Sequence, residues 1–195
     1  CRVLLGARCS ADGGLGVEGG GGLPTVDGEC WRRVARVFRS ASPARVGAVI
    51  ATPGSAVDVE VVGDLAYVAD DRYGLRVIDV SNPAFPVELG AFDTPGSAVD
   101  VEVLGDLAYV THSNYVALPG GLRVIDVSDP AFPVEIGALD TDAAQDVEVV
   151  GDLAYVADHD SGVRVIDVSD PAFPVEIGAL DTPDIANDVE VVGDL

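Results

Sequence analysis

The stretch DVEVVGDLAYVAD, residues 58–70, decides the fold because the chain repeats it. A close copy, DVEVLGDLAYVTH, starts at Asp100, and the original wording returns at Asp146. A last copy starts at Asp188 and runs as DVEVVGDL to Leu195. The starting points are 42, 46 and 42 residues apart. A period of about 40–45 residues is typical of four-stranded propeller blades or of helical solenoid repeats.

The composition of one repeat favours strands over helices. Four runs of five or six residues, rich in Val, Ile, Leu and Tyr, are separated by turn residues at 58–62, 65–69, 75–80 and 87–92. No run shows a sustained 3.6-residue period. Gly63-Asp64 predicts a two-residue hairpin with a type II′ turn, and Pro86 predicts that the fourth strand is an outer edge. The sequence therefore predicts an all-β β-propeller with four-stranded antiparallel blades.

The repeat divides the chain into predicted blades at 58–99, 100–145 and 146–187, followed by the first strand of a truncated blade at 188–195. Residues 15–57 match the pattern only at scattered positions, with GGGG where other repeats have VVGD, which indicates a degenerate blade. Residues 1–14 are unassigned. Propellers typically close with about four to eight blades, so we expect an open arc or a fragment of about four.

The stretch GLRVIDVSNPAFPVELGAFDT, residues 74–94, with LAYVAD before it, resembles the LVIVD-repeat family of bacterial and archaeal surface proteins. The resemblance covers residues 58–195 and recurs three times in full. It implies a β-propeller fold and an extracellular or cell-surface location. It implies no catalytic residue, because the family as a whole has no defined activity.

Charge and composition exclude several classes of partner. The net charge is −22, and residues 46–195 hold four arginines against 29 carboxylates, which disfavours binding to nucleic acid. No apolar run approaches the roughly 18 residues of a membrane span. The three cysteines, Cys1, Cys9 and Cys30, all precede the clear repeats, so no disulfide scaffold is expected there.

Differences among the repeats point to one binding face. The GD turns and the SNPAFP or SDPAFP connections barely change, whereas DDRYG, HSNYVALPGG and DHDSG occupy one loop position in successive repeats. In an up-and-down blade these variable loops and the connections between blades emerge at the same end. We expect a protein or glycan ligand there, unless the loops have drifted without function. The candidate residues are Asp71, Tyr73, His112, Asn114, Tyr115 and His159.

Sites for cations or catalysis are weaker alternatives. Asp158 and Asp160 in DHDSG resemble the start of a calcium loop but lack its later acidic ligand, so Ca²⁺ is the one cofactor considered. The recurring glutamates of the first strand, Glu60, Glu102, Glu148 and Glu190, are expected to ring the axis, either hydrated or paired with the recurring Arg76, Arg123 and Arg164. No phosphate loop or dinucleotide fingerprint is present. The sequence predicts a non-enzymatic interaction module; a propeller enzyme or a cation-binding propeller is the alternative.

Overall fold

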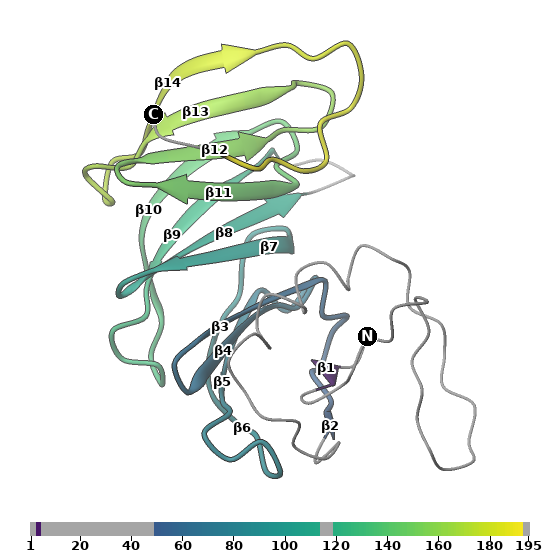
Figure 1. Ribbon diagram of the computed structural model, residues 1–195, viewed down its shortest axis with the longest axis vertical. Coiled ribbons are helices and arrows are strands. Elements are labelled where there is room, and N and C mark those ends of the chain that lie inside the picture. Colours follow the sequence, from purple (N-terminus) through teal and green to yellow (C-terminus); the bar gives the residue numbers. More distant parts are fainter. Residues whose placement is uncertain (1–2, 5–48, 114–118, 193–195) are drawn as a thin grey trace.

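The computed structural model describes residues 3–4, 49–113 and 119–192, and within them the chain forms strands and loops with no helix. Three four-stranded antiparallel sheets dominate (Figure 1). The first contains β3 (Asp58–Val62), β4 (Leu65–Ala69), β5 (Leu75–Asp79) and β6 (Val87–Phe92). The second contains β7 (Ser97–Leu104), β8 (Leu107–Ser113), β9 (Gly120–Asp126) and β10 (Val134–Thr141). The third contains β11 (Asp146–Val150), β12 (Leu153–Ala157), β13 (Val163–Asp167) and β14 (Val175–Leu180).

Each sheet is an up-and-down meander, in which strands consecutive in sequence are neighbours. The predicted all-β fold with four-stranded antiparallel blades is therefore confirmed. Of the predicted degenerate blade, residues 15–48 lie outside the described residues, as do most of 1–14. A two-stranded pairing of β1 (Val3–Leu4) with β2 (Val49–Ile50) precedes the first blade.

The first hairpin of each blade turns at Gly-Asp, as expected. Gly63, Gly105 and Gly151 have φ of +61°, +64° and +61°. The aspartate that follows each glycine does not adopt a positive φ, so the turn is type II′. A Cβ on these glycines would meet nothing within 4 Å. Glycine is required here by the backbone angle and not by crowding.

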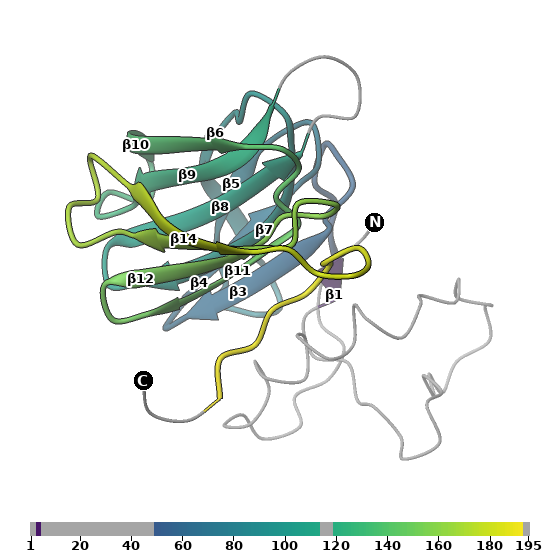
Figure 2. The ribbon, with the colours of Figure 1, turned by 90° about the horizontal axis from the view of Figure 1, so that it is seen from above.

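The sheets stack face to face, with the first strands β3, β7 and β11 next to one another (Figures 1 and 2). Between the first two blades, Leu75 and Val77 pack against Val101, Val110 and Ile125, all at most 1% exposed. A second cluster joins the next pair of blades through Leu122, Val124, Val147, Val156 and Ile166. Because both faces of the middle blade are covered, its strands β8 and β9 are buried at nearly every position.

The arc is open at the third blade. Tyr67 and Tyr109 are 4% and 3% exposed where the next blade covers them, whereas the equivalent Tyr155 is only half-buried. Leu180 at the end of β14 is 66% exposed. The described blades therefore form an open arc and not a closed ring.

Residues 188–192 do not form the strand that the repeat predicts. The Val189 N–H nevertheless donates to Asp146 Oδ2 at 2.8 Å, the contact that the first strand of a following blade would make. A first strand forms its ladder only with the second strand of its own blade. No such partner lies within the described residues, so this segment follows β11 without a ladder.

Neighbouring blades also touch at their outer strands, through glycines that leave room for a loop. A Cβ on Gly90 would lie 2.4 Å from the Pro130 carbonyl oxygen, and one on Gly137 would lie 2.0 Å from that of Pro171. The proline-containing loop of one blade thus seats against the fourth strand of the preceding blade. At Gly178, the equivalent position in the third blade, the nearest atom would be Val165 Cβ at 3.8 Å.

This difference makes a matched pair of variants. Gly137→Ala is expected to lower the free energy of unfolding by about 1–3 kcal/mol, because the new methyl group forces the loop away. At about 2–4 °C per kcal/mol, its melting temperature should fall by several degrees. Gly178→Ala should stay within about 0.5 kcal/mol of the parent. Thermal unfolding followed by circular dichroism measures both, and equal shifts would contradict the inter-blade contact.

Candidate functional site

One position at the variable end of the blades organises its surroundings in all three repeats. This position is the second residue after the LAYV segment of each repeat. It is Asp70 in the first blade, His112 in the second and Asp158 in the third, and each side chain is fully buried. This position lies where the second strand ends and where the connection from the preceding blade crosses over it. The hydrogen bonds of this side chain therefore determine how the connection is attached to the blade.

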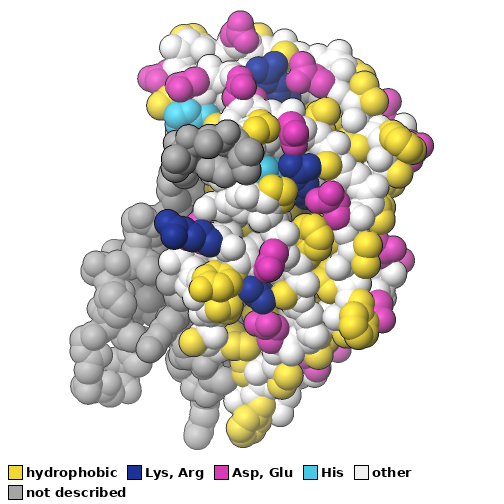
Figure 3. All heavy atoms as spheres, turned by 180° about the vertical axis from the view of Figure 1, so that it is seen from behind, with side chains coloured by type: hydrophobic (Ala, Val, Ile, Leu, Met, Phe, Trp, Pro, Cys, Tyr) yellow, Lys and Arg dark blue, Asp and Glu magenta, His cyan; other side chains and the backbone are white. Residues whose placement is uncertain are grey.

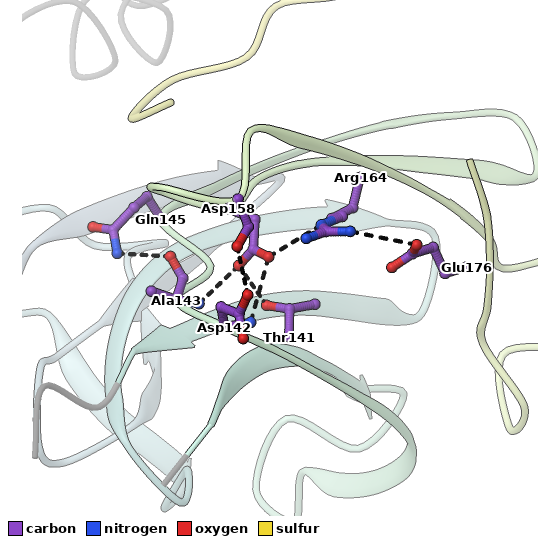
Figure 4. Close-up of polar contacts among 8 residues, drawn as sticks. Thr141, Asp142, Ala143, Gln145, Asp158, Arg164 and Glu176 are labelled. Carbon is purple, nitrogen blue, oxygen red and sulfur yellow. Dashed lines mark hydrogen bonds and ion pairs between the residues drawn. The ribbon is translucent and has the colours of Figure 1, made fainter. Parts of the chain in front are cut away.

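Asp158 is the best connected of the three (Figure 4). Its Oδ1 accepts from the Thr141 hydroxyl at 2.7 Å and from the Ala143 N–H at 2.8 Å. Its Oδ2 accepts from the Asp142 N–H at 3.4 Å and from Arg164 Nε at 3.2 Å. Both oxygens are engaged within the protein. Asp158 therefore ties the 141–143 connection to the third blade.

Asp70 repeats the arrangement in the first blade. It accepts from the Thr52 hydroxyl at 2.6 Å and from the Gly54 N–H at 2.8 Å. A Cβ on Gly54 would lie 2.3 Å from the Asp70 carbonyl oxygen, so the connection can approach only with glycine at this point. The buried carboxylates at this end serve structure, with their charge balanced by hydroxyl, amide or guanidinium donors.

The weak calcium candidates do not form a ligand cluster. Asp158 has no oxygen left without a donor, and Asp160 is exposed, with its carboxylate 3.4 Å from His159 Nδ1. Among the described residues, no three His, Cys, Asp or Glu side chains lie close enough together to hold a metal ion.

His112 replaces the aspartate in the middle blade, and its predicted place on an exposed binding face is wrong. β8 continues to Ser113, so His112 is a strand residue paired with Ala98 and Gly121 and has no exposed surface. Arg123 Nε donates to its Nε2 at 3.0 Å, which leaves the proton on Nδ1. Among the described residues that N–H has no hydrogen-bond partner, although it points toward Gly96.

The chemistry of the imidazole explains a local rearrangement. Thr52 and Thr141 donate to the buried carboxylate of their blades, but an Nδ1–H group cannot accept such a bond. The equivalent Thr94 therefore donates to the Gly96 carbonyl at 2.7 Å. Burial, aided by the Arg123 charge and opposed by Asp140, lowers the pKa of His112 to about 4. His112 is neutral at pH 7.

The remaining candidates of the predicted binding face are displayed to differing degrees. Tyr73 is 44% exposed, and its ring centroid lies 5.6 Å from Arg76 Cζ, a cation–π distance. Asp71 and His159 adopt φ of +51° and +47°, and they form isolated β-bridges to Ala98 at the start of β7 and to Ala186. Asn114 and Tyr115 lie outside the described residues. Of the six candidates, the structure thus shows one well-exposed side chain, two half-buried ones and one buried one.

The predicted pairing of first-strand glutamates with the recurring arginines is also wrong. Each arginine pairs with a glutamate of the adjacent fourth strand: Arg76 with Glu88 at 3.5 Å, Arg123 with Glu135 at 4.0 Å and Arg164 with Glu176 at 3.5 Å. Arg123 also forms a 2.6 Å pair with Asp140. In each blade a whole strand separates the arginine from the first-strand glutamate, so cross-strand neighbours are nearer.

The carboxylates of the first strands act instead between blades. Asp58 Oδ2 accepts the Val101 N–H at 3.3 Å, and Asp100 Oδ2 accepts the Val147 N–H at 2.9 Å. Glu60 accepts from the Val103 N–H in the same way. The first strand has a ladder partner on one side only, so its other N–H groups need acceptors. The recurring aspartate of the preceding blade supplies one, joined in the first blade by Glu60, a role that sequence reasoning missed.

Together these features define a β-propeller-type repeat module whose blades are linked by backbone-to-carboxylate bonds. A family model described as the LVIVD repeat matches residues 53–94, 95–141 and 143–182, and the chain belongs to this family. Among solved structures, the chain is similar to the "computationally designed Ika8 protein", with a TM-score of 0.52 at 10% identity. The match covers 67% of this chain and 38% of the designed one, and it supports the fold alone. No curated protein matches the sequence.

Removing an inter-blade acceptor tests its structural role. Asp100→Ala leaves the buried Val147 N–H without its acceptor and should lower the free energy of unfolding by about 1–3 kcal/mol. Asp100→Asn keeps an oxygen acceptor and should lose less. Asp146→Ala is the matched control, since the Val189 N–H that it releases is only partly buried and water can replace the acceptor. Urea unfolding compares them; equal losses at Asp100 and Asp146 would rule out the proposed dependence on burial.

His112 should make stability depend on pH. Its folded-state pKa of about 4 lies below the ordinary value of 6.5, so the unfolded chain binds more protons between these values. The contribution of His112 is therefore fully present above pH 6.5 and is lost as the pH falls through 4, by up to about 3 kcal/mol. Urea unfolding at pH 7 and 4.5 measures this loss. His112→Gln should remove that part of the slope, and identical slopes in both proteins would contradict the assignment.

Proposed function

We propose that this chain is a non-enzymatic interaction module that works outside the cell or at the cell surface. It would bind a protein or glycan ligand at the end of the blades that carries the variable loops. The observation that carries this proposal is the contrast between the two ends of a constant framework. Three blades share strands, turns and inter-blade bonds, yet their loops differ at one end only.

The framework supports such a role because it frees the loops from holding the fold together. The buried Asp70 and Asp158 accept hydrogen bonds from the inter-blade connections. The exposed loops beside them can therefore vary in sequence without unfolding of the blade. Tyr73 and Arg72 are exposed at this end, and in the third blade the half-buried His159 and the exposed Asp160 lie in the equivalent loop. An aromatic ring beside charged groups is a common element of protein and glycan recognition.

The extracellular part of the proposal rests on the family and on composition. The resemblance to surface proteins implies this setting, and a strongly acidic chain without lysine is compatible with it. The described residues include no helix that could cross a lipid bilayer. Antibodies against this chain should label intact cells of the source organism without permeabilisation, and labelling only after permeabilisation would refute the location.

The ligand-binding part is tested with the purified chain on a printed glycan array and a panel of purified surface proteins. Tyr73→Ser combined with His159→Ser should weaken any specific binding at least tenfold, because both side chains lie at the variable end. Leu104→Ser is the control, since Leu104 is 50% exposed beside the constant Gly-Asp turn of the second blade. Binding that resists the double change but fails in the control variant would place the site elsewhere.

A further inference from the structure

The constant loops present an aromatic side chain to solvent in every blade. Phe85, Phe132 and Phe173 are 75%, 74% and 74% exposed. The valines two residues later are 54–55% exposed, and the residues four positions later, Leu89, Ile136 and Ile177, are 39%, 36% and 58% exposed. These nine side chains are here called the outer rim. Each phenylalanine lies just before a fourth strand, and the other two residues of each set lie in the first half of β6, β10 or β14.

The exposure of the outer rim does not result from the open ends of the arc. The middle blade has a neighbour on each side, yet Phe132 and Val134 are as exposed as their counterparts in the end blades. Figure 3 shows hydrophobic side chains at intervals along the right of that view, the side of the constant loops, with acidic side chains between them. A further blade would therefore leave the phenylalanines and valines uncovered, whereas Ile177, at 58% against 36–39% for its counterparts, owes part of its exposure to the open end. Regular exposed apolar patches of this kind mark interaction surfaces.

The loop that carries each phenylalanine is rigid. In the first blade, Asp79 accepts from the Ser81 N–H at 2.8 Å, Asn82 Oδ1 accepts from the Ala84 N–H at 3.1 Å, and the Phe85 N–H donates to the Asn82 carbonyl at 2.8 Å. The same three bonds recur in the other blades. Prolines on both sides restrict the backbone further. A side chain held in this way loses little conformational freedom when it binds a partner.

A β-bulge turns the last member of each apolar set outward. In β6, Ile78 pairs with Glu88 and Val77 pairs with Gly90, so Leu89 is an extra, unpaired residue. Ile136 and Ile177 hold the same place in β10 and β14. A β-bulge changes the direction in which a side chain points. Because the bulge occurs at the equivalent residue in all three blades, it is a regular part of the blade structure.

Acidic side chains outnumber basic ones beside the outer rim. Glu88, Glu135 and Glu176 lie within it, with side chains 39%, 35% and 41% exposed although each is paired with the arginine of its own blade, and the loops add the exposed Asp129 and Asp170. Hydrogen bonds from Ser81, Ser128 and Ser169 lower the pKa values of Asp79, Asp126 and Asp167, which keeps these carboxylates ionised. The chain contains no lysine. A second copy of the chain, or an anionic membrane, would bring like charges together at this surface.

We propose that the outer rim binds an extended, cationic segment of another protein in which apolar and basic residues alternate. Its apolar side chains cover the Phe and Val of each blade, while its Lys or Arg side chains meet the loop aspartates and the exposed edges of the glutamates between them. In the described part of the chain, β6, β10 and β14 are the outermost strands of their sheets, the arrangement to which extended segments add. Three equivalent sites favour a long or repetitive partner through effective concentration.

Fluorescence anisotropy of a labelled ten-residue peptide of alternating Val and Lys, titrated with the full chain, tests this proposal. The peptide should bind, and its affinity should fall with added salt. The combined changes Phe85→Ser, Phe132→Ser and Phe173→Ser should weaken binding at least tenfold, whereas Tyr73→Ser, at the opposite end of the blades, should not change it. A peptide of alternating Ser and Lys should bind at least tenfold more weakly. Equal binding of the two peptides, or of the triple variant and the parent, would overturn the proposal.

Two further measurements separate other occupants of the outer rim. In sedimentation velocity, the parent and the triple variant should show the same state of association. In flotation with phosphatidylcholine vesicles, both proteins should remain unbound. Self-association or vesicle binding that depends on the three phenylalanines would overturn the choice of a cationic segment. Phe132→Ser alone, which alters one site of three, provides a variant with minimal disturbance and should weaken binding by a smaller factor.

Discussion

The bond on which the arrangement of the blades depends joins a carboxylate of one innermost strand to a backbone N–H of the next. An innermost strand has a ladder partner on one side only, and its remaining N–H groups face the neighbouring blade where water has little access. Asp58 and Asp100 supply acceptors to Val101 and Val147, and Asp146 offers the same to Val189. The coupling has a direction, because each blade caps the one that follows it. The apolar clusters between blades could slide along one another, whereas these bonds set the register in which they meet.

Much of this fold could be predicted from local sequence, for identifiable reasons. The four strands of the first blade were expected at 58–62, 65–69, 75–80 and 87–92, and the structure differs only in ending β5 at Asp79. Gly63 required a positive φ, and Pro86 cannot donate within a ladder, so the turn and the outer strand followed from backbone chemistry. These signals act over two or three residues, and the repeat presents each of them several times.

The candidate site was harder to predict because its contacts cross blades. The residue type of Glu60 does not show that its partner is a backbone amide 43 residues away. The arginines were the only cations in the complete repeats, so the recurring ones were the obvious partners to predict. His112 was assigned to a loop because HSNYVALPGG looks like an insertion, but β8 continues through Ser113. Its alignment with Asp70 and Asp158 was the signal that could have placed it inside. Residues 188–192 show again that local sequence is not sufficient. They repeat the DVEVV of β3 and β11, yet they form no strand, and the described residues include no second strand that pairs with them.

Repetition within one chain has more than one physical origin, and burial separates them. Gly63 recurs because of its φ, and Gly90 recurs as Gly137 because the loop carbonyl of the following blade seats against it. Phe85 recurs with neither explanation, at an exposure of about three quarters that hardly changes between blades. A buried side chain that recurs is accounted for by packing, but an exposed apolar one gains nothing from the fold and adds a risk of aggregation. The constant edge of the blades therefore carries as much information about partners as the variable loops do, although comparison of the repeats alone draws attention to the loops.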